Sequence, residues 1–209
     1  MCGRYTLKVS HRPDLSKLGL QGGDRYNIAP QSSVVVIDER ETFSTMRWDY
    51  SPVWSKTPMH ISNARSETLR EKPSFRDAKR CVLVADGWYE WQRLEQGKQP
   101  WYHHCHGELL FFAGICNDST GCAIVTREAH SNIARIHHRQ PVLLEGRAVP
   151  GWLAGHDLFA SAMTRDVQCH PVSKAVNSPR NDNATLIEEV EPDIEPLDST
   201  GEVGDLFGH

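Results

Sequence analysis

The 209-residue sequence contains no long apolar segment. Its longest apolar runs, such as 109–115, have the length of a strand, whereas a membrane-spanning helix needs roughly 20 residues. No basic segment followed by an apolar stretch opens the chain, so nothing indicates a secretory signal. We therefore expect a cytosolic protein with no membrane partner and a single hydrophobic core.

The six cysteines lack the paired spacing of a disulfide framework, so in a reducing compartment we expect free thiols. The possible metal ligands are His103, His104, Cys105, His106, Cys116 and Cys122. In a strand, His103 and Cys105 would face away from His104, and there is no Cys-x-x-Cys pair. We expect no metal or other cofactor; a non-catalytic zinc module stays an alternative that metal analysis would test.

Positive charge is missing from the C-terminal end of the chain. All 23 Lys and Arg lie in residues 1–180 with 18 acids, which gives this body a net charge of +5. Residues 181–209 hold the other nine acids and have little to bury, so we expect a folded domain over 1–180, to which the resemblance described below assigns catalysis, and a disordered acidic tail over 181–209. A basic body with an acidic tail suits a polyanion binder. The alternative is a solvating extension without a task.

Short strand-like segments with turns between them dominate the body. The expected strands are 34–38, 42–50, 81–86, 88–93, 99–106, 109–116 and 123–126. The expected helices are 13–18, 74–79, 128–135 and 157–163. Gln96-Gly97-Lys98 and His106-Gly107-Glu108 are typical of hairpin turns, which predicts a mostly antiparallel sheet in one α+β domain.

The chain begins Met1-Cys2-Gly3-Arg4, so removal of one methionine would leave Cys2 with a free α-amine beside its thiol. An α-amine titrates at about pH 7.7 to 8.0, so part of it is nucleophilic at neutral pH. It can condense with an aldehyde, and the neighbouring thiol can then close a five-membered thiazolidine. The alternative is a small apolar cysteine that opens a buried strand over 2–7.

Four further segments carry polar groups that a core would not require: 61–68, 85–91, 136–141 and 169–177. Glu90 lies among aromatic residues, surroundings that tend to raise the pKa of a carboxyl group and suit a general acid or base. Each segment alone is ambiguous. A single histidine is more often a structural donor than a catalyst, and Glu90 could simply pair with an arginine.

Together these segments resemble the SOS-response-associated peptidase (SRAP) family, whose members crosslink themselves to abasic sites in single-stranded DNA. The matching motifs are Cys2-Gly3-Arg4-Tyr5, Arg25-Tyr26-Asn27-Ile28-Ala29-Pro30, Asn63-Ala64-Arg65-Ser66-Glu67-Thr68, Asp86-Gly87-Trp88-Tyr89-Glu90-Trp91, His137-His138-Arg139 and His170-Pro171-Val172-Ser173. The resemblance covers nearly all of residues 2–177. It implies an α+β fold with a branched, mostly antiparallel, partly barrel-like sheet flanked by short helices, and a positively charged groove leading to Cys2.

The resemblance also implies catalytic roles for Cys2, Asn63, Glu90 and His137. The amine of Cys2 would attack the aldehyde of the opened sugar, and its thiol would close a thiazolidine crosslink that shields the lesion. Glu90 and His137 would move protons, while Asn63 would orient the amine or sugar. Lyase and peptidase (hydrolase) activities belong to the same expectation, although an aminopeptidase could remove Met1 without self-cleavage.

The expected partner is single-stranded DNA with abasic sites, bound by a monomer that associates with the nucleoid in the DNA damage response. Arg4, Arg65 and Arg76 are candidate phosphate ligands, and Trp54 is a candidate base-stacking platform. Trp54 could equally belong to the core.

Two departures and one rival family qualify the resemblance. Gln140 stands where family members usually carry methionine, and Asp49 follows Trp48 where glycine is usual, which affects the packing near His137 and the DNA-stacking loop. Cys2-Gly3 also begins N-terminal-nucleophile glutamine amidotransferases, in which the thiol attacks an amide. No downstream motif of that family is present, and a glutaminase assay would separate the two.

Overall fold

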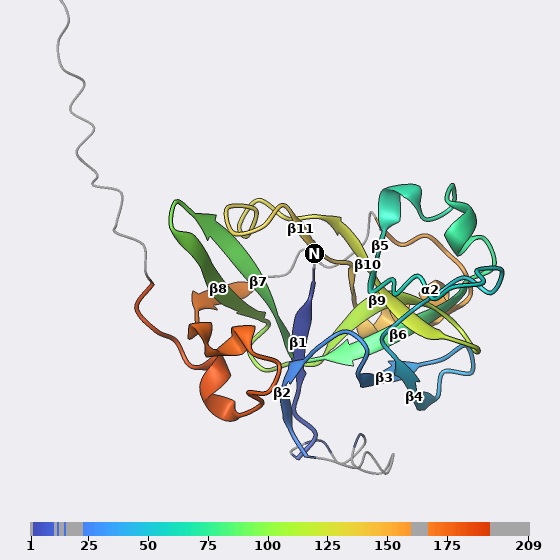
Figure 1. Cartoon of the computed structure of the whole chain (residues 1–209). Helices are drawn as coiled ribbons and strands as arrows, with labels where there is room; N and C mark the ends of the chain where they lie inside the picture. Colours follow the sequence, from blue (N-terminus) through green and yellow to red (C-terminus); the bar gives the residue numbers. More distant parts are fainter. Residues whose placement is uncertain (1, 11, 13–14, 16–22, 160–166, 193–209) are drawn as a thin grey trace, which may run out of the picture.

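The computed structural model describes residues 2–10, 12, 15, 23–159 and 167–192, which form two β-sheets (Figure 1). The first sheet has the strand order β13-β8-β7-β1-β2. Its strands are β1 (Arg4–Leu7), β2 (Arg25–Ile28), β7 (Gly87–Leu94), β8 (Gly97–His104) and β13 (Gln168–Pro171). The second sheet has the order β11-β10-β9-β6-β3-β4, with β12 on β9 and β5 on β10. Its strands are β3 (Ser33–Ile37), β4 (Phe43–Arg47), β5 (Asn63–Arg65), β6 (Lys79–Ala85), β9 (Leu110–Asn117), β10 (Gly121–Glu128), β11 (Arg139–Pro141) and β12 (Leu143–Leu144).

Antiparallel pairing dominates the described strands, and only β5 and β10 pair in parallel. The short helices that lie wholly in the described part of the chain are α2 (Val149–Leu153), η1 (Ser66–Thr68), η2 (Pro73–Phe75), η3 (Gly146–Ala148), η4 (Lys174–Asn177) and η5 (Ala184–Ile187). The single α+β domain and its branched, mostly antiparallel sheet are therefore confirmed, although the sheets are not closed into a barrel. No helix among the described residues combines the length and apolar character needed to span a membrane.

The two expected hairpin turns have different outcomes. Residues 95–96 join β7 to β8 as an antiparallel hairpin, as expected. The expectation was wrong at His106-Gly107-Glu108, because β9 leaves β8 and pairs with β6, β10 and β12 of the other sheet. Nearly every side chain of β9 is buried, so this strand gains more apolar contact at the centre of the second sheet than it would at the edge of the first.

The expected helices at 74–79 and 128–135 were wrong. In 74–79, only the 3₁₀ turn η2 forms before β6 begins at Lys79. In 128–135, β10 ends at Glu128 and turns follow. Segments this short are marginal helices, so tertiary packing decides their conformation. Residues 157–159, the described part of the expected helix 157–163, are not helical, and the Asp157 carboxylate accepts bonds from Arg70 and Arg80. Residues 160–163 and most of 13–18 lie outside the described residues.

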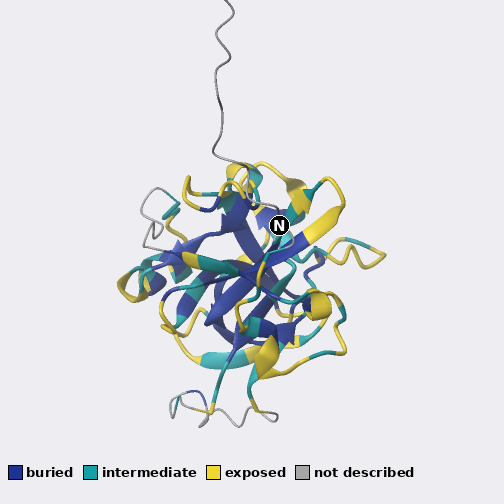
Figure 2. Ribbon diagram, turned by 90° about the vertical axis from the view of Figure 1, so that its left-hand side faces the viewer, coloured by how far each residue is buried: buried dark blue, intermediate teal, exposed yellow. Residues whose placement is uncertain are grey.

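Aromatic packing holds β1 of the first sheet against the second sheet. Tyr5 of β1 lies with its ring centroid 5.2 Å from that of Trp48 and 5.9 Å from that of Phe112. Phe112 in turn packs edge-on against Trp88, at 6.0 Å. Figure 2 shows that the centre of the molecule is buried and that exposed residues lie on the surrounding loops and on parts of the outer strands. The β1 strand is thus fixed on both sides, and it carries the N-terminal residues to a defined place.

Residues 181–192, which the sequence assigned to the tail, pack on the first sheet. Asp182 accepts backbone bonds from Tyr26 and Asn27, and Leu186 is buried. Val190 N donates to Pro171 O over 3.0 Å, which adds this segment beside β13. The packed part of the chain therefore extends further than the expected boundary at 180, because sparse apolar residues and one aspartate find partners that a composition average does not reveal.

Candidate active site

The pairing of β1 with β7 brings the N-terminal residues to Glu90. Arg4 lies opposite Tyr89, so one more step of the antiparallel register places Gly3 opposite Glu90. Cys2 is completely buried, and its Sγ lies 3.8 Å from Arg4 O. Burial, and after it the negative charge of Glu90, raise the pKa of the Cys2 thiol well above its ordinary value. Burial alone would also fit a core cysteine, so the polar groups around it carry the functional interpretation.

Glu90 and His137 form a pair of titratable groups with opposite pKa shifts. Burial raises the pKa of the Glu90 carboxyl to about 7, and burial lowers the pKa of His137 to about 4. His137 Nδ1 lies 3.8 Å from Glu90 Oε2. At neutral pH the imidazole is therefore neutral and the carboxyl is partly protonated. Such divergent environments are a common property of groups that act as acid and base.

Asn63 holds the main chain of the nucleophile. Its Nδ2 donates to Cys2 O over 2.9 Å and to Ser62 Oγ over 3.1 Å. The parallel pairing of β5 with β10 sets this position, with Asn63 opposite Ile124. Three of the predicted catalytic residues thus approach the fourth, Cys2, from separate strands and loops.

A pocket of about 750 Å³ opens beside Glu90 and His137. Its lining includes Arg65, Glu90, Arg93, Lys98, Arg135, His137 and His138. Figure 1 shows the start of β1 between the β7–β8 hairpin and β5. The lining joins a buried acid–imidazole pair to a rim rich in cationic side chains, an arrangement that suits a polyanionic substrate.

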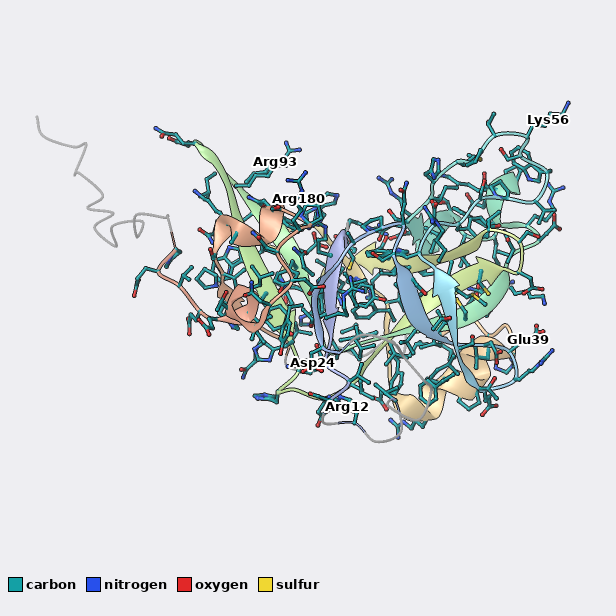
Figure 3. All side chains as sticks on the ribbon, turned by 60° about the horizontal axis from the view of Figure 1, so that its bottom comes forward. Arg12, Asp24, Glu39, Lys56, Arg93 and Arg180 are labelled. Carbon is teal, nitrogen blue, oxygen red and sulfur yellow. The ribbon has the colours of Figure 1, made fainter. Side chains whose placement is uncertain are left out.

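The predicted DNA-binding residues do not all gather at the pocket. Arg65 is exposed at its rim, whereas Trp54 and Arg76 lie about η2, where the Trp54 indole nitrogen is 3.5 Å from Pro73 O. Figure 3 shows Lys56, from the loop of Trp54, far across the molecule from Arg93. Trp54 is 57% exposed, so the alternative of a core tryptophan is wrong.

Arg4 points into the domain. Its guanidinium donates to Asn27 Oδ1 over 2.9 Å and to Val176 O over 3.1 Å. The Asn27 amide donates in turn to the carbonyls of Val176, Ser178 and Asn181. This network ties β1 and β2 to the chain after β13, and sequence reasoning missed it even though Asn27 belongs to a noted motif.

Gln140 holds the loop that leads to His137. Its Oε1 accepts a 2.7 Å bond from His130 N. Further along the loop, the Arg135 guanidinium lies 4.7 Å from the centroid of Trp101, a cation–π contact. Gln140, which stands where the family motif usually has methionine, therefore anchors the loop to the sheets.

The zinc alternative finds no ligand set in the described part of the chain, where no three His, Cys, Asp or Glu residues could hold a metal ion. His103 is buried and stacks on Trp88, whereas His104 stacks on Tyr102.

Comparisons with known proteins show the family of the chain. The family model described as SOS response associated peptidase (SRAP) matches residues 1–179. Among curated relatives, "Abasic site processing protein YoqW" of Bacillus subtilis is 32% identical over 90% of this chain and 99% of that protein. "Abasic site processing protein YedK" of Escherichia coli is 32% identical over 91% and 100%, and HMCES of Gallus gallus is 32% identical over 79% and 66%.

Solved structures share the fold. A phage-related protein from Bordetella bronchiseptica has a TM-score of 0.66 and 26% identity over 83% of this chain and 95% of that one. A protein from Bacteroides thetaiotaomicron has a TM-score of 0.68 and 23% identity over 79% and 85%. Fold and site define a single-domain α+β protein with a cysteine at position 2 beside an acid–imidazole pair. The chain belongs to the SRAP family.

Proposed function

We propose that the chain processes abasic sites in single-stranded DNA by forming a thiazolidine crosslink through Cys2 once Met1 is removed. Relatives at 32% identity are named abasic site processing proteins. The observation that carries the proposal is the convergence of Cys2, Asn63, Glu90 and His137, with Glu90 titrating near neutral pH.

The reaction begins at the aldehyde form of the abasic sugar. The uncharged α-amine of Cys2 attacks C1′ and gives a carbinolamine. Protonated Glu90 donates its proton to the hydroxyl, which leaves as water, and an iminium forms between the amine nitrogen and C1′. His137 serves the earlier ring opening, where its imidazole transfers protons at the sugar oxygens. The Asn63 bond to Cys2 O holds the amine in place for the attack.

Ring closure then uses the thiol. The raised pKa keeps Cys2 as a thiol at neutral pH, so the thiol must lose its proton as sulfur adds to the iminium carbon. The Glu90 carboxylate left by the first step accepts that proton and returns to its starting form. Aldehyde, amine and thiol thus become thiazolidine and one water, with no change of oxidation state.

DNA binding is proposed to use the cationic rim. Arg65 lies at the pocket, and Arg76 with the exposed Trp54 offers a phosphate ligand and a stacking surface beside η2. We assign Arg4 to positioning β1, because its guanidinium bonds Asn27 and Val176 inside the domain.

The direct test incubates the purified protein with a single-stranded abasic oligonucleotide and follows a denaturant-resistant shift in mobility. Mass spectrometry first confirms that Met1 is absent. An oligonucleotide whose abasic sugar has been reduced to the alcohol is the matched control, since it keeps the phosphates but offers no aldehyde. We expect a shift with the first oligonucleotide only; no shift for the processed protein would contradict the proposal.

Removal of residues 193–209 should tighten binding to intact single-stranded DNA by about threefold to tenfold at low salt. These residues contain five acids and no Lys or Arg, so they compete with DNA for the cationic rim. The truncation begins at 193 because residues 181–192 pack on the first sheet. Fluorescence anisotropy at two salt concentrations measures the effect.

A second variant separates charge from length in this experiment. It keeps residues 193–209 but replaces each Asp with Asn and each Glu with Gln in this segment. This variant should bind DNA as tightly as the truncated protein. Equal affinity of all three proteins at low ionic strength would show that the acidic segment does not compete.

A further inference from the structure

An ion pair between Glu67 and Arg139 lies beside the His137 loop. The Arg139 guanidinium donates to both carboxylate oxygens of Glu67, over 2.6 and 2.9 Å, and to Thr126 O over 2.7 Å. The Arg139 side chain is only 10% exposed, whereas Glu67 is 49% exposed. The bonds from Arg139 lower the pKa of Glu67 to about 2, so the carboxylate is charged at any physiological pH. A bidentate pair of this kind fixes direction as well as distance.

The register of β11 on β10 turns the Arg139 backbone away from β10. Two backbone hydrogen bonds between these segments lie on either side of Arg139: Val142 N donates to Val125 O, and Ala129 N donates to His138 O. Residues of an antiparallel pair alternate between exchanging hydrogen bonds and exchanging none. By this alternation Arg139, opposite Glu128, exchanges none with β10. Its N–H lies instead 3.0 Å from His137 Nδ1.

This contact selects one tautomer of the neutral imidazole. Nδ1 lies 3.0 Å from Arg139 N and 3.1 Å from Arg139 O, so it could accept from the first or donate to the second. A backbone N–H can only donate, and burying it without an acceptor is costly. Nδ1 of His137 therefore accepts, and the ring proton lies on Nε2.

We propose that Glu67 is a positioning residue for crosslinking: through Arg139 it holds the backbone N–H that keeps His137 in the Nε2–H tautomer. This inference rests on the proposed function, in which His137 transfers protons during sugar ring opening. Nε2–H is then the donor available to the sugar oxygen. Without Glu67, Arg139 loses two of its bonds, the start of β11 can shift, and both tautomers become populated.

The kinetic test compares Glu67→Ala with the unaltered protein under single-turnover conditions. We expect crosslinking of the abasic oligonucleotide to slow by about 10- to 100-fold, the range typical of a misaligned catalytic group. Affinity for intact single-stranded DNA should stay equal or rise, because the variant gains one positive charge. Glu67→Gln keeps an acceptor for Arg139 and should recover part of the rate. Glu145→Ala, which removes the 2.6 Å contact of Arg147 with Glu145, is the matched control and should crosslink normally.

The decisive readout is the tautomer itself, from ¹⁵N spectra of imidazole-labelled protein. We expect the unaltered protein to carry the His137 proton on Nε2 and Glu67→Ala to show a mixture. A variant with an unchanged tautomer, whatever its rate, would overturn the inference. Should Glu67→Ala fail to fold, Glu67→Gln, which keeps only one of the two acceptors for Arg139, should show a smaller but detectable share of the Nδ1–H tautomer, and an unchanged tautomer in that variant would overturn the inference. If the unaltered protein itself does not crosslink, the proposed function fails, while the spectra still test the tautomer assignment.

Discussion

Protein that keeps a residue ahead of Cys2 should form no stable crosslink, although its thiol is intact. A glutamate inserted between Met1 and Cys2 prevents ordinary removal of methionine and turns the reactive nitrogen into an amide, whose lone pair is delocalised and not nucleophilic. Both the borohydride-trappable imine and the denaturant-resistant adduct should therefore be lost. Mass spectrometry of the purified variant shows whether the added residues remain; their removal would reveal self-processing.

The matched variant Cys2→Ser separates the amine from the thiol. It keeps a free α-amine when Met1 is removed, so it should still form an imine that borohydride traps. That imine can lead to strand cleavage by β-elimination, but without sulfur no thiazolidine should accumulate. Crosslinking by the blocked protein at the normal rate would show that the thiol or a lysine attacks first, and the proposed order of steps would fail.

Glu90→Gln should slow crosslinking by about 10²- to 10⁴-fold, the usual contribution of a general acid. The amide keeps the size of the buried side chain but cannot donate a proton to the departing hydroxyl. Binding of intact single-stranded DNA should change little, because the substitution alters the charge of the pocket by at most one unit. Single-turnover rates and anisotropy titrations on the same preparation measure the two effects separately. A wild-type rate at neutral pH would remove Glu90 from the mechanism.

The pH profile of the crosslinking rate should be bell-shaped. Glu90 titrates at about 7, so its protonated, donating fraction falls as pH rises through 7. The α-amine gains its nucleophilic form as pH rises towards about 7.7 to 8.0. The rate should therefore be highest in the interval around pH 7 to 8, and Glu90→Gln should lose the alkaline decline. Persistence of that decline in Glu90→Gln would assign it to another group.

Local patterns in the sequence predicted the strands well and the helices poorly. The expected strands from 34–38 to 123–126 all overlap observed strands, because a short apolar segment bounded by turn residues is a property of neighbouring residues. The short helical segments had no such support, and the turn after His106 could not reveal which sheet β9 would join. That choice depends on strands far apart in the chain.

The sequence alone determined the chemistry that is available: a cysteine directly after Met1, a carboxyl group among aromatic residues, the adjacent histidines 137 and 138, and a basic body. Only the tertiary structure decided which of these groups are in contact and how burial shifts their pKa values. Pairing of β1 with β7 brings Cys2 beside Glu90 and turns Arg4 towards Asn27. The closeness of Glu67 to Arg139, like the burial that moves the pKa values of Glu90 and His137, also arises from distant segments. Burial and contact between residues many tens of positions apart depend on the packing of whole sheets, and no local pattern encodes them.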